Sequence, residues 1–287
     1  GGRARTTPML RVPRSTLQAM APSDARIALA CLDLTSLGAD DSPATAAALA
    51  RRAHHASGTP AALCVYPELL LAARMSLMRE GIPQVRTATV VNFPDGGIDA
   101  DRAESETRRA LAVGADEIEL VFPWRALQGG DRAAAAALLK RVKARCAKST
   151  LKVILQSAAF ADLSGLRSAA ELAVACGADF LVAATGKLGA AQSLDAARCL
   201  AAVIAATRPS VGLKMTGDMH TMAQAAACIA IAAQVYGRER VVPARFRIGA
   251  DALLEVLLAE LGDGDREVLR AVGEHVAAQE GLHGQRL

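Results

Sequence analysis

The chain has 287 residues, of which 52 % are hydrophobic and only 3 % aromatic, and its net charge is +4. This length suits one (β/α)8 barrel or two small domains, and the scarcity of aromatics means that alanine, leucine and valine must build the core. Charges of both signs are mixed, and no basic block with interleaved aromatic residues occurs, which argues against a nucleic-acid-binding protein.

Residues 1–24 are rich in arginine, serine, threonine and proline, hold no acid before Asp24 and lack a hydrophobic segment. This composition is loosely similar to that of a transit peptide, but we interpret the segment as a flexible N-terminal extension. No apolar run is long enough to cross a membrane, and the six cysteines are scattered without a paired or metal-binding spacing. We therefore expect a cytoplasmic protein with reduced thiols, no metal and no cofactor.

After this extension, apolar runs typical of buried strands alternate with alanine-rich stretches typical of helices. The predicted strands are Arg26–Asp33, Ala61–Tyr66, Arg86–Asn92, Glu117–Phe122, Leu151–Gln156, Asp179–Ala184, Ser210–Met215 and Arg245–Ala250. The predicted helices are Ala44–Ser57, Pro67–Glu80, Asp101–Val113, Asp131–Ala147, Leu163–Cys176, Ser193–Thr207, Thr221–Tyr236 and Asp251–Leu261.

Strand–helix units that repeat about every 30 residues predict right-handed βαβ connections. A (β/α)8 TIM barrel over residues 25–262 satisfies this pattern, because a closed barrel leaves no strand edge exposed. An open, doubly wound α/β sheet is the alternative, but its glycine-rich first turn is missing. We expect residues 263–287 to form a C-terminal helix, over Arg266–Gln279, and a tail.

In such a barrel the chemistry lies at the carboxyl ends of the strands. Lys214 lies among apolar neighbours within a predicted strand, where an unpaired ammonium is costly to bury. It therefore either pairs with an acid or has a lowered pKa and acts as a nucleophile or proton carrier. Glu119 and Lys152 have the parity to face the same interior. We therefore predict that Lys214, Glu119 and Lys152 form a cluster, whether the role of that cluster is catalytic or purely structural.

Asp33 and Cys64 belong to the first two predicted strands. Asp33 could act in catalysis or, together with Thr35, cap the helix that follows. Cys64 is more typical of a small core residue than of a reactive thiol.

Several motifs resemble those of the 2-deoxyribose-5-phosphate aldolase (DeoC-type class I aldolase) family. They are Leu32-Asp-Leu-Thr35, Cys64-Val-Tyr-Pro67, Ala88-Thr-Val-Val-Asn-Phe-Pro94, Gly114-Ala-Asp-Glu117, Val121-Phe-Pro-Trp-Arg-Ala-Leu127, Thr185-Gly-Lys187 and Arg247-Ile-Gly249. The resemblance extends from about residue 25 to about residue 262. It implies a TIM barrel, a lyase that cleaves a sugar phosphate through a lysine Schiff base, and a possible homodimer.

The resemblance also implies roles for individual residues. Lys214 matches the lysine that tunes the imine-forming lysine, and Lys152 matches a member of the proton-relay cluster. Asp33 and Cys64 match residues that line the substrate pocket. The pair Gly186-Lys187 matches part of the phosphate grip, and Gly217 lies in the loop that completes it.

The chain departs from the family pattern at its most important positions. Val182 stands where the family has the imine-forming lysine, and Glu119 replaces the relay aspartate. Asp218 replaces a glycine of the phosphate loop, while Asp251 and Ala252 replace two serines at the start of the last helix. Carboxylates at those places would repel a phosphate, so ordinary cleavage of deoxyribose 5-phosphate is disfavoured.

Three hypotheses follow. The first is a diverged enzyme in which Lys214 forms the imine with an unphosphorylated aldehyde or sugar-like substrate. The second is a catalytically inactive homologue that acts in binding or regulation. The third is a metal-dependent lyase with Asp218, Asp251 and Glu119 as ligands. Ordinary aldolase activity would require the alignment at Val182 to be out of register.

Overall fold

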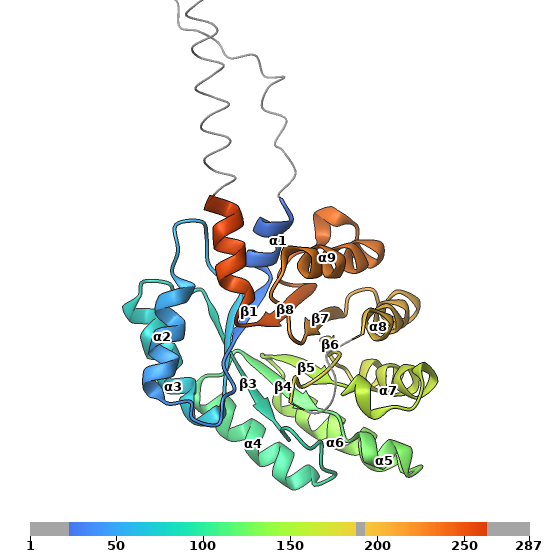
Figure 1. Ribbon diagram of the computed structural model, residues 1–287. Helices are drawn as coiled ribbons and strands as arrows, with labels where there is room; N and C mark the ends of the chain where they lie inside the picture. The colour runs from blue at the N-terminus through green and yellow to red at the C-terminus, as the bar shows by residue number, and fades with distance from the viewer. Residues whose placement is uncertain (1–22, 188–192, 263–287) are drawn as a thin grey trace, which may run out of the picture.

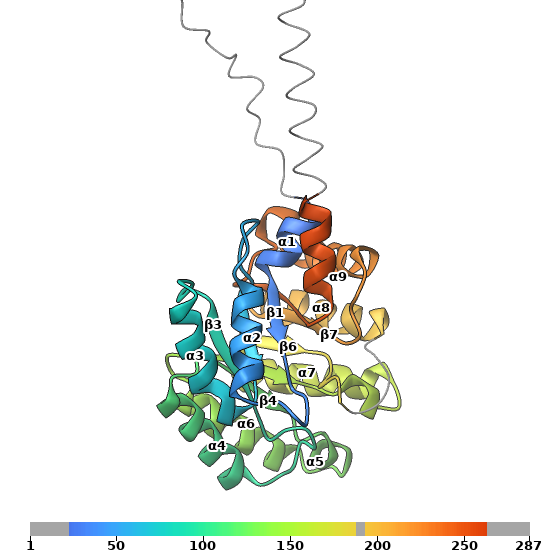
Figure 2. The ribbon, with the colours of Figure 1, turned by 60° about the vertical axis from the view of Figure 1, so that its left-hand side comes forward.

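The computed structural model describes residues 23–187 and 193–262. Within them eight parallel strands form one closed barrel in chain order, and the helices surround it (Figures 1 and 2). The predicted (β/α)8 architecture is thus confirmed. The strands are β1 (Leu32–Thr35), β2 (Ala62–Val65), β3 (Arg86–Val91), β4 (Glu117–Val121), β5 (Thr150–Ile154), β6 (Phe180–Val182), β7 (Gly212–Thr216) and β8 (Phe246–Ala250).

Most of the described helices begin where a polar side chain caps the first turn. Ser42 and Thr221, for example, each form a capping box with the residue three positions later. The helices are α1 (Asp24–Ala30), α2 (Pro43–Ala53), α3 (Leu70–Arg79), α4 (Ala100–Val113), α5 (Trp124–Gln128), α6 (Arg132–Arg145), α7 (Leu163–Ala175), α8 (Leu194–Thr207) and α9 (Met222–Tyr236). Residues 253–262 are also helical.

The strand predicted over Arg26–Asp33 is wrong in its first half, which forms α1. Ser23 caps this helix by accepting a hydrogen bond from the Arg26 backbone N–H. The helix buries Ile27 and Leu29, so a short apolar run is explained equally well by a strand and by a buried helix. The other predicted elements agree to within a few residues, and α5 was not predicted. The helix expected over Arg266–Gln279 lies outside the described residues.

The interior of the barrel is divided into apolar and charged parts. On β2 and β3, Ala62, Cys64, Ala88 and Val90 form one apolar cluster. On β4, β5 and β6, Val121, Ile154 and Val182 form another, against which Phe93 packs. Other inward-facing positions hold the buried charges described below. A separate and much larger aliphatic core lies between the strands and the helices.

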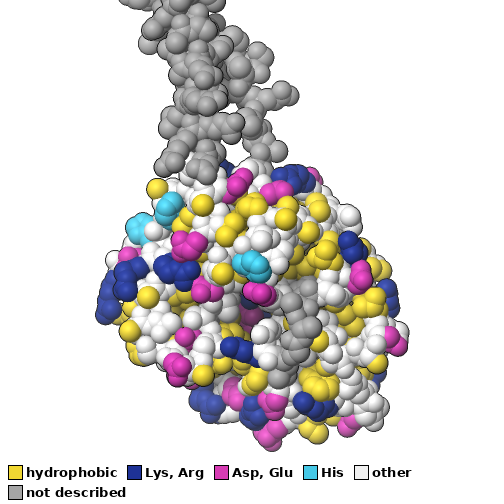
Figure 3. Space-filling view, viewed as in Figure 1, with side chains coloured by type: hydrophobic (Ala, Val, Ile, Leu, Met, Phe, Trp, Pro, Cys, Tyr) yellow, Lys and Arg dark blue, Asp and Glu magenta, His cyan; other side chains and the backbone are white. Residues whose placement is uncertain are grey.

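The outer surface gives little indication of a charged partner. On the face shown in Figure 3, acidic and basic side chains are interspersed, with no large patch of one sign among the described residues. No helix in the described part of the chain is both long and apolar enough to cross a bilayer.

Candidate active site

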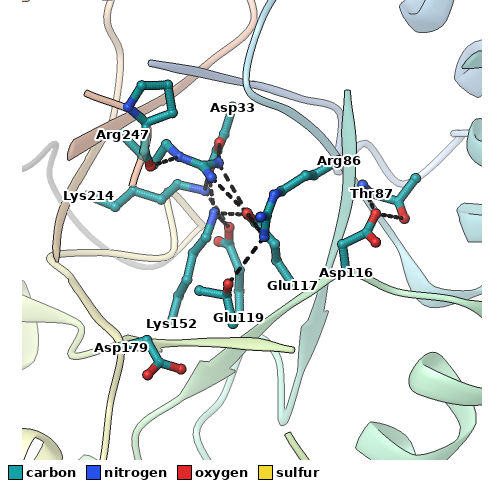
Figure 4. Close-up of polar contacts among 12 residues, drawn as sticks. Asp33, Arg86, Thr87, Asp116, Glu117, Glu119, Lys152, Asp179, Lys214 and Arg247 are labelled. Carbon is teal, nitrogen blue, oxygen red and sulfur yellow. Dashed lines mark hydrogen bonds and ion pairs between the residues drawn. The ribbon is translucent and has the colours of Figure 1, made fainter. Parts of the chain in front are cut away.

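Six charged side chains meet in the barrel interior and form what we term the charge network (Figure 4). Its members come from β1, β4, β5, β7 and β8, and each is at most 3 % exposed. They are the acids Asp33, Glu117 and Glu119 and the bases Lys152, Lys214 and Arg247. Three negative and three positive charges therefore balance one another.

Lys214 lies at the end of this network that is nearest the carboxyl ends of the strands. Its Nζ is 2.5 Å from Glu119 Oε1 and 2.9 Å from Asp33 Oδ2. Gly249 on the adjacent strand gives the lysine chain room, because a Cβ there would lie 2.8 Å from Lys214 Cε. Lys214 is thus held against two carboxylates on strands β1 and β4.

Lys152 and Arg247 form the deeper part. Lys152 Nζ lies 2.5 Å from Asp33 Oδ2, 2.6 Å from Glu117 Oε2 and 3.2 Å from Glu119 Oε1. Arg247 donates to Asp33 Oδ1 at 2.5 Å and to Glu117 Oε1 at 2.7 Å. Its Nε donates to the Pro243 carbonyl. Asp33 is therefore shared by all three bases.

These contacts fix the protonation states. Burial disfavours the charged form of Asp33, but Arg247, Lys152 and Lys214 outweigh it and hold the pKa of the carboxyl far below its usual range. Burial likewise opposes the Lys214 ammonium, but Asp33 and Glu119 outweigh it and raise the pKa of this amine. The pKa of Lys152 is raised for the same reason. Lys214 is therefore an ammonium at neutral pH and has no lone pair with which to attack a carbonyl.

Val182 faces the same interior as Lys214. The two residues are register partners on β6 and β7, and Val182 is fully buried. On the same strand Phe180 also points inward, because its ring lies 5.8 Å from Lys152 Nζ. Residues two apart on a strand share a face, so an aliphatic side chain occupies the interior position at the end of β6.

A cavity of about 210 Å³ opens above Lys214 at the carboxyl ends of the strands. Lys214 and Glu119 are the members of the charge network that line it. Val90, Phe93 and Ile154 supply apolar wall. The position is that expected for the ligand site of a (β/α)8 barrel.

All of the predicted substrate-binding residues except Asp218 line the cavity above Lys214. Cys64, Gly186, Lys187, Gly217 and Asp251 line this cavity. Burial raises the pKa of the Cys64 thiol, in keeping with a core residue.

Asp218 does not line the cavity above Lys214. It lines a different cavity, between β7 and α9, and pairs with His220 at the surface. Asp251 does stand at the rim, but its carboxylate is 2.6 Å from Arg52 Nη1. Of the two aspartates that we expected to repel a phosphate, only Asp251 lines the cavity above Lys214. Arg52 neutralises part of the charge of the Asp251 carboxylate.

Sequence reasoning missed two members of the charge network, Glu117 and Arg247. Glu117 lies two residues before Glu119 and so shares its inward face. Arg247 lies inside the apolar run of β8, as Lys214 lies inside that of β7. These two signals were available in the sequence.

The proposed metal ligands do not come together. Among the residues that the structure describes, no group of three His, Cys, Asp or Glu side chains is placed to hold a metal ion. Glu119 is bonded within the charge network, Asp251 to Arg52 and Asp218 to His220. The metal-site hypothesis for these three acids is therefore wrong.

Known proteins share this fold. The chain superposes on a candidate deoxyribose-phosphate aldolase of Toxoplasma gondii ME49 with a TM-score of 0.74 and 25 % identity, covering 82 % of this chain and 94 % of that one. A candidate deoxyribose-phosphate aldolase of Coccidioides immitis gives a TM-score of 0.70 at 23 % identity, covering 86 % and 93 %. The tetrameric deoxyribose phosphate aldolase of Aeropyrum pernix gives 0.65 at 19 %, covering 83 % and 92 %.

The last two likenesses establish the fold alone. Family membership follows from the sequence itself, because the pattern of the DeoC/LacD family aldolases matches residues 26–257. The chain belongs to the DeoC/LacD aldolase family.

Proposed function

We propose that this family member binds a small, unphosphorylated aldehyde or sugar-like molecule above Lys214 and forms no imine with that lysine. The proposal rests on one observation. The amine of Lys214 is buried between Asp33 and Glu119, which keep it protonated, while its register partner Val182 offers no amine. Among the three hypotheses, the geometry thus favours a binding or regulatory homologue over a diverged imine-forming enzyme.

The same pair of side chains can recognise such a ligand. An ammonium donates hydrogen bonds to a carbonyl or hydroxyl oxygen, and the neighbouring Glu119 carboxylate accepts them from a hydroxyl. Phe93 and Ile154 on the cavity wall would cover the carbon skeleton. The cavity is therefore suited to a molecule of a few carbons that carries oxygens on one side.

A second candidate function is supported by Lys187. This lysine is exposed and lines the same cavity, and its side chain pairs with none of the residues that the structure describes. Among the described residues, this amine has no carboxylate partner from which it would have to separate before it reaches a carbonyl group in the cavity. Under this candidate, the imine forms on Lys187 at the rim of the cavity.

Borohydride trapping separates these functions. The protein is incubated with propanal or 2-deoxyribose at pH 7.5, reduced with sodium borohydride and analysed by peptide mass spectrometry. In parallel, binding of 2-deoxyribose is measured by ligand-observed NMR. Saturable binding that is weakened by Lys214→Met, without an adduct, is the expected result.

The remaining outcomes have distinct meanings. An adduct on Lys214 would refute our proposal and support the diverged enzyme. An adduct on Lys187 that disappears in Lys187→Arg would support the second candidate. Absence of any binding to the folded protein would reject a ligand site of this kind.

The preference for an unphosphorylated ligand is tested at Asp251. We expect 2-deoxyribose 5-phosphate to bind no better than 2-deoxyribose, and Asp251→Asn to improve binding of the phosphate ester selectively. A carboxylate about 4 Å from a phosphate repels it by about 4 kcal/mol at an effective dielectric near 20, and Arg52 reduces this figure. Tight binding of the ester by the unaltered protein would contradict this preference.

We further propose a cytoplasmic protein that assembles with copies of itself. All six cysteines are free and buried, as suits a reducing compartment. The Aeropyrum pernix relative is a tetramer. Light scattering of the purified protein tests the assembly, and a monomeric mass at micromolar concentration would reject it.

A further inference from the structure

A second cavity, of about 570 Å³, opens at the amino-terminal ends of the strands, and we call it the basal cavity. Arg86 and Phe180, the first residues of β3 and β6, line it, and so does Val211, just before β7. The basal cavity has more than twice the volume of the cavity above Lys214, which lies at the opposite ends of the same strands. It is therefore separate from the proposed ligand site.

The charges around the basal cavity do not cancel. The charge network supplies Arg247 to its wall, but that network is neutral as a whole. Asp179 also lines the cavity, and its carboxylate is neutralised by Lys143 at 2.7 Å. Two further arginines, Arg86 and Arg208, complete the charged lining. They are left in excess, so the cavity carries a surplus of two positive charges.

These two arginines are available to a ligand. Arg86 has a side chain that is 52 % exposed, and its nearest carboxylate, Glu117, lies 3.6 Å away and is already bonded to Lys152 and Arg247. Arg208 ends helix α8, is exposed, and forms no ion pair with any residue in the described ranges. Guanidinium groups placed in this way are suited to bind the oxygens of a phosphate.

The remainder of the wall is apolar. Phe180, Val211, Val242 and Pro243 line it, and Val242 is 39 % exposed although it is hydrophobic. The Phe180 ring lies over Gly212, where a Cβ would come within 2.3 Å of the ring. The glycine thus allows the ring to form part of the cavity wall.

We propose that the basal cavity binds a small phosphate monoester that carries a compact apolar group. A phosphate monoester has a charge of about −1.5 to −2 at neutral pH, which matches the two surplus arginines. Its apolar group would cover Phe180, Val211 and Val242. The site needs neither Lys214 nor the cavity above it.

Binding of phenyl phosphate, measured by titration calorimetry, tests the proposal. Ser210 lines the basal cavity and is exposed, so Ser210→Asp introduces a negative charge and Ser210→Asn is its uncharged match. We expect Ser210→Asp to weaken binding at least about tenfold and Ser210→Asn to leave it within about twofold. Arg208→Ala should weaken it by a similar factor, because it removes a charge-assisted contact.

The controls assign the binding to this cavity. Arg198→Ala removes an exposed arginine of the same helix and should have no effect, and Lys187→Ala alters only the opposite cavity. The proposal is overturned if phenyl phosphate shows no saturation below about 10 mM, at which a site of millimolar Kd would be filled. It is also overturned if Ser210→Asp and Ser210→Asn behave alike, or if Lys187→Ala abolishes binding.

Discussion

Replacing Val182 by lysine should create an amine that forms an imine, because the charge network has no carboxylate left to stabilise a fourth cation. The new ammonium would lie next to Lys214, the register partner of Val182. At a separation of about 5 Å and an effective dielectric near 20, the two charges repel each other by about 3 kcal/mol. The carboxylates of Asp33 and Glu119, which pair with Lys214, reduce this repulsion. At its full value the repulsion would raise the ratio of neutral amine to ammonium roughly a hundredfold over that of a free lysine at the same pH, and this factor is an upper limit.

The assay is borohydride trapping with propanal at pH 8, with peptide mass spectrometry to locate the adduct. Val182→Met is the matched control, since it adds similar length without an amine. We expect an adduct at position 182 in Val182→Lys and none in Val182→Met or in the unaltered protein. Enlarging a side chain within the cluster of Val121, Ile154 and Val182 should cost about 1–3 kcal/mol of stability, which thermal unfolding monitors. A folded Val182→Lys protein without an adduct would refute the reasoning.

Three further predictions concern stability. Arg247→Met leaves three buried carboxylates with two buried lysines and should lower the free energy of unfolding by about 3–5 kcal/mol in urea titrations, because one buried negative charge is no longer compensated. Arg198→Met at the surface should cost about 0.5 kcal/mol, and similar losses in the two variants would contradict the prediction. Gly212→Ala places a Cβ 2.3 Å from the Phe180 ring and should cost about 1–3 kcal/mol, whereas Gly97→Ala meets only ordinary contacts at 3.6 Å, and equal melting temperatures would count against this packing. The lowered pKa values of Asp33 and Glu117 contribute stability that is complete above the unfolded carboxyl range, about pH 4, and is lost as the pH falls. The raised pKa values of Lys152 and Lys214 contribute stability that is complete below about pH 10 and is lost as the pH rises further. Stability should therefore form a plateau between about pH 5 and pH 9, and a maximum confined to pH 4 would disprove it.

The alternation of apolar runs with alanine-rich stretches was sufficient to predict the barrel, because strands covered on both faces are apolar throughout. The same rule gave the wrong structure for α1, where Ile27 and Leu29 are buried by a helix. A run of seven residues contains too few turns for its periodicity to distinguish the two structures.

Parity along the strands also predicted that Lys214, Glu119 and Lys152 would face the same interior, and the structure places them in contact. The partners of each charge were harder to predict. Arg247 reaches Asp33 because β8 pairs with β1 and closes the barrel. This contact depends on the register between the two strands, which cannot be read from the sequence of either strand alone. Asp218 lies outside the cavity above Lys214 because of the direction in which the loop after β7 runs. The alternation of side chains along a strand does not determine the direction of a loop.

The signs of the buried charges follow the order of the chain. All three acids of the network lie on β1 and β4, in the first half of the barrel, and all three bases lie on β5, β7 and β8, in the second. A polypeptide severed between β4 and β5 would yield one fragment with three interior anions and another with three interior cations. Neither fragment could bury its own like charges away from water, because it lacks the opposite charges that would compensate them. Each fragment supplies the charges that the other needs. The two fragments should therefore fold only when they associate with each other.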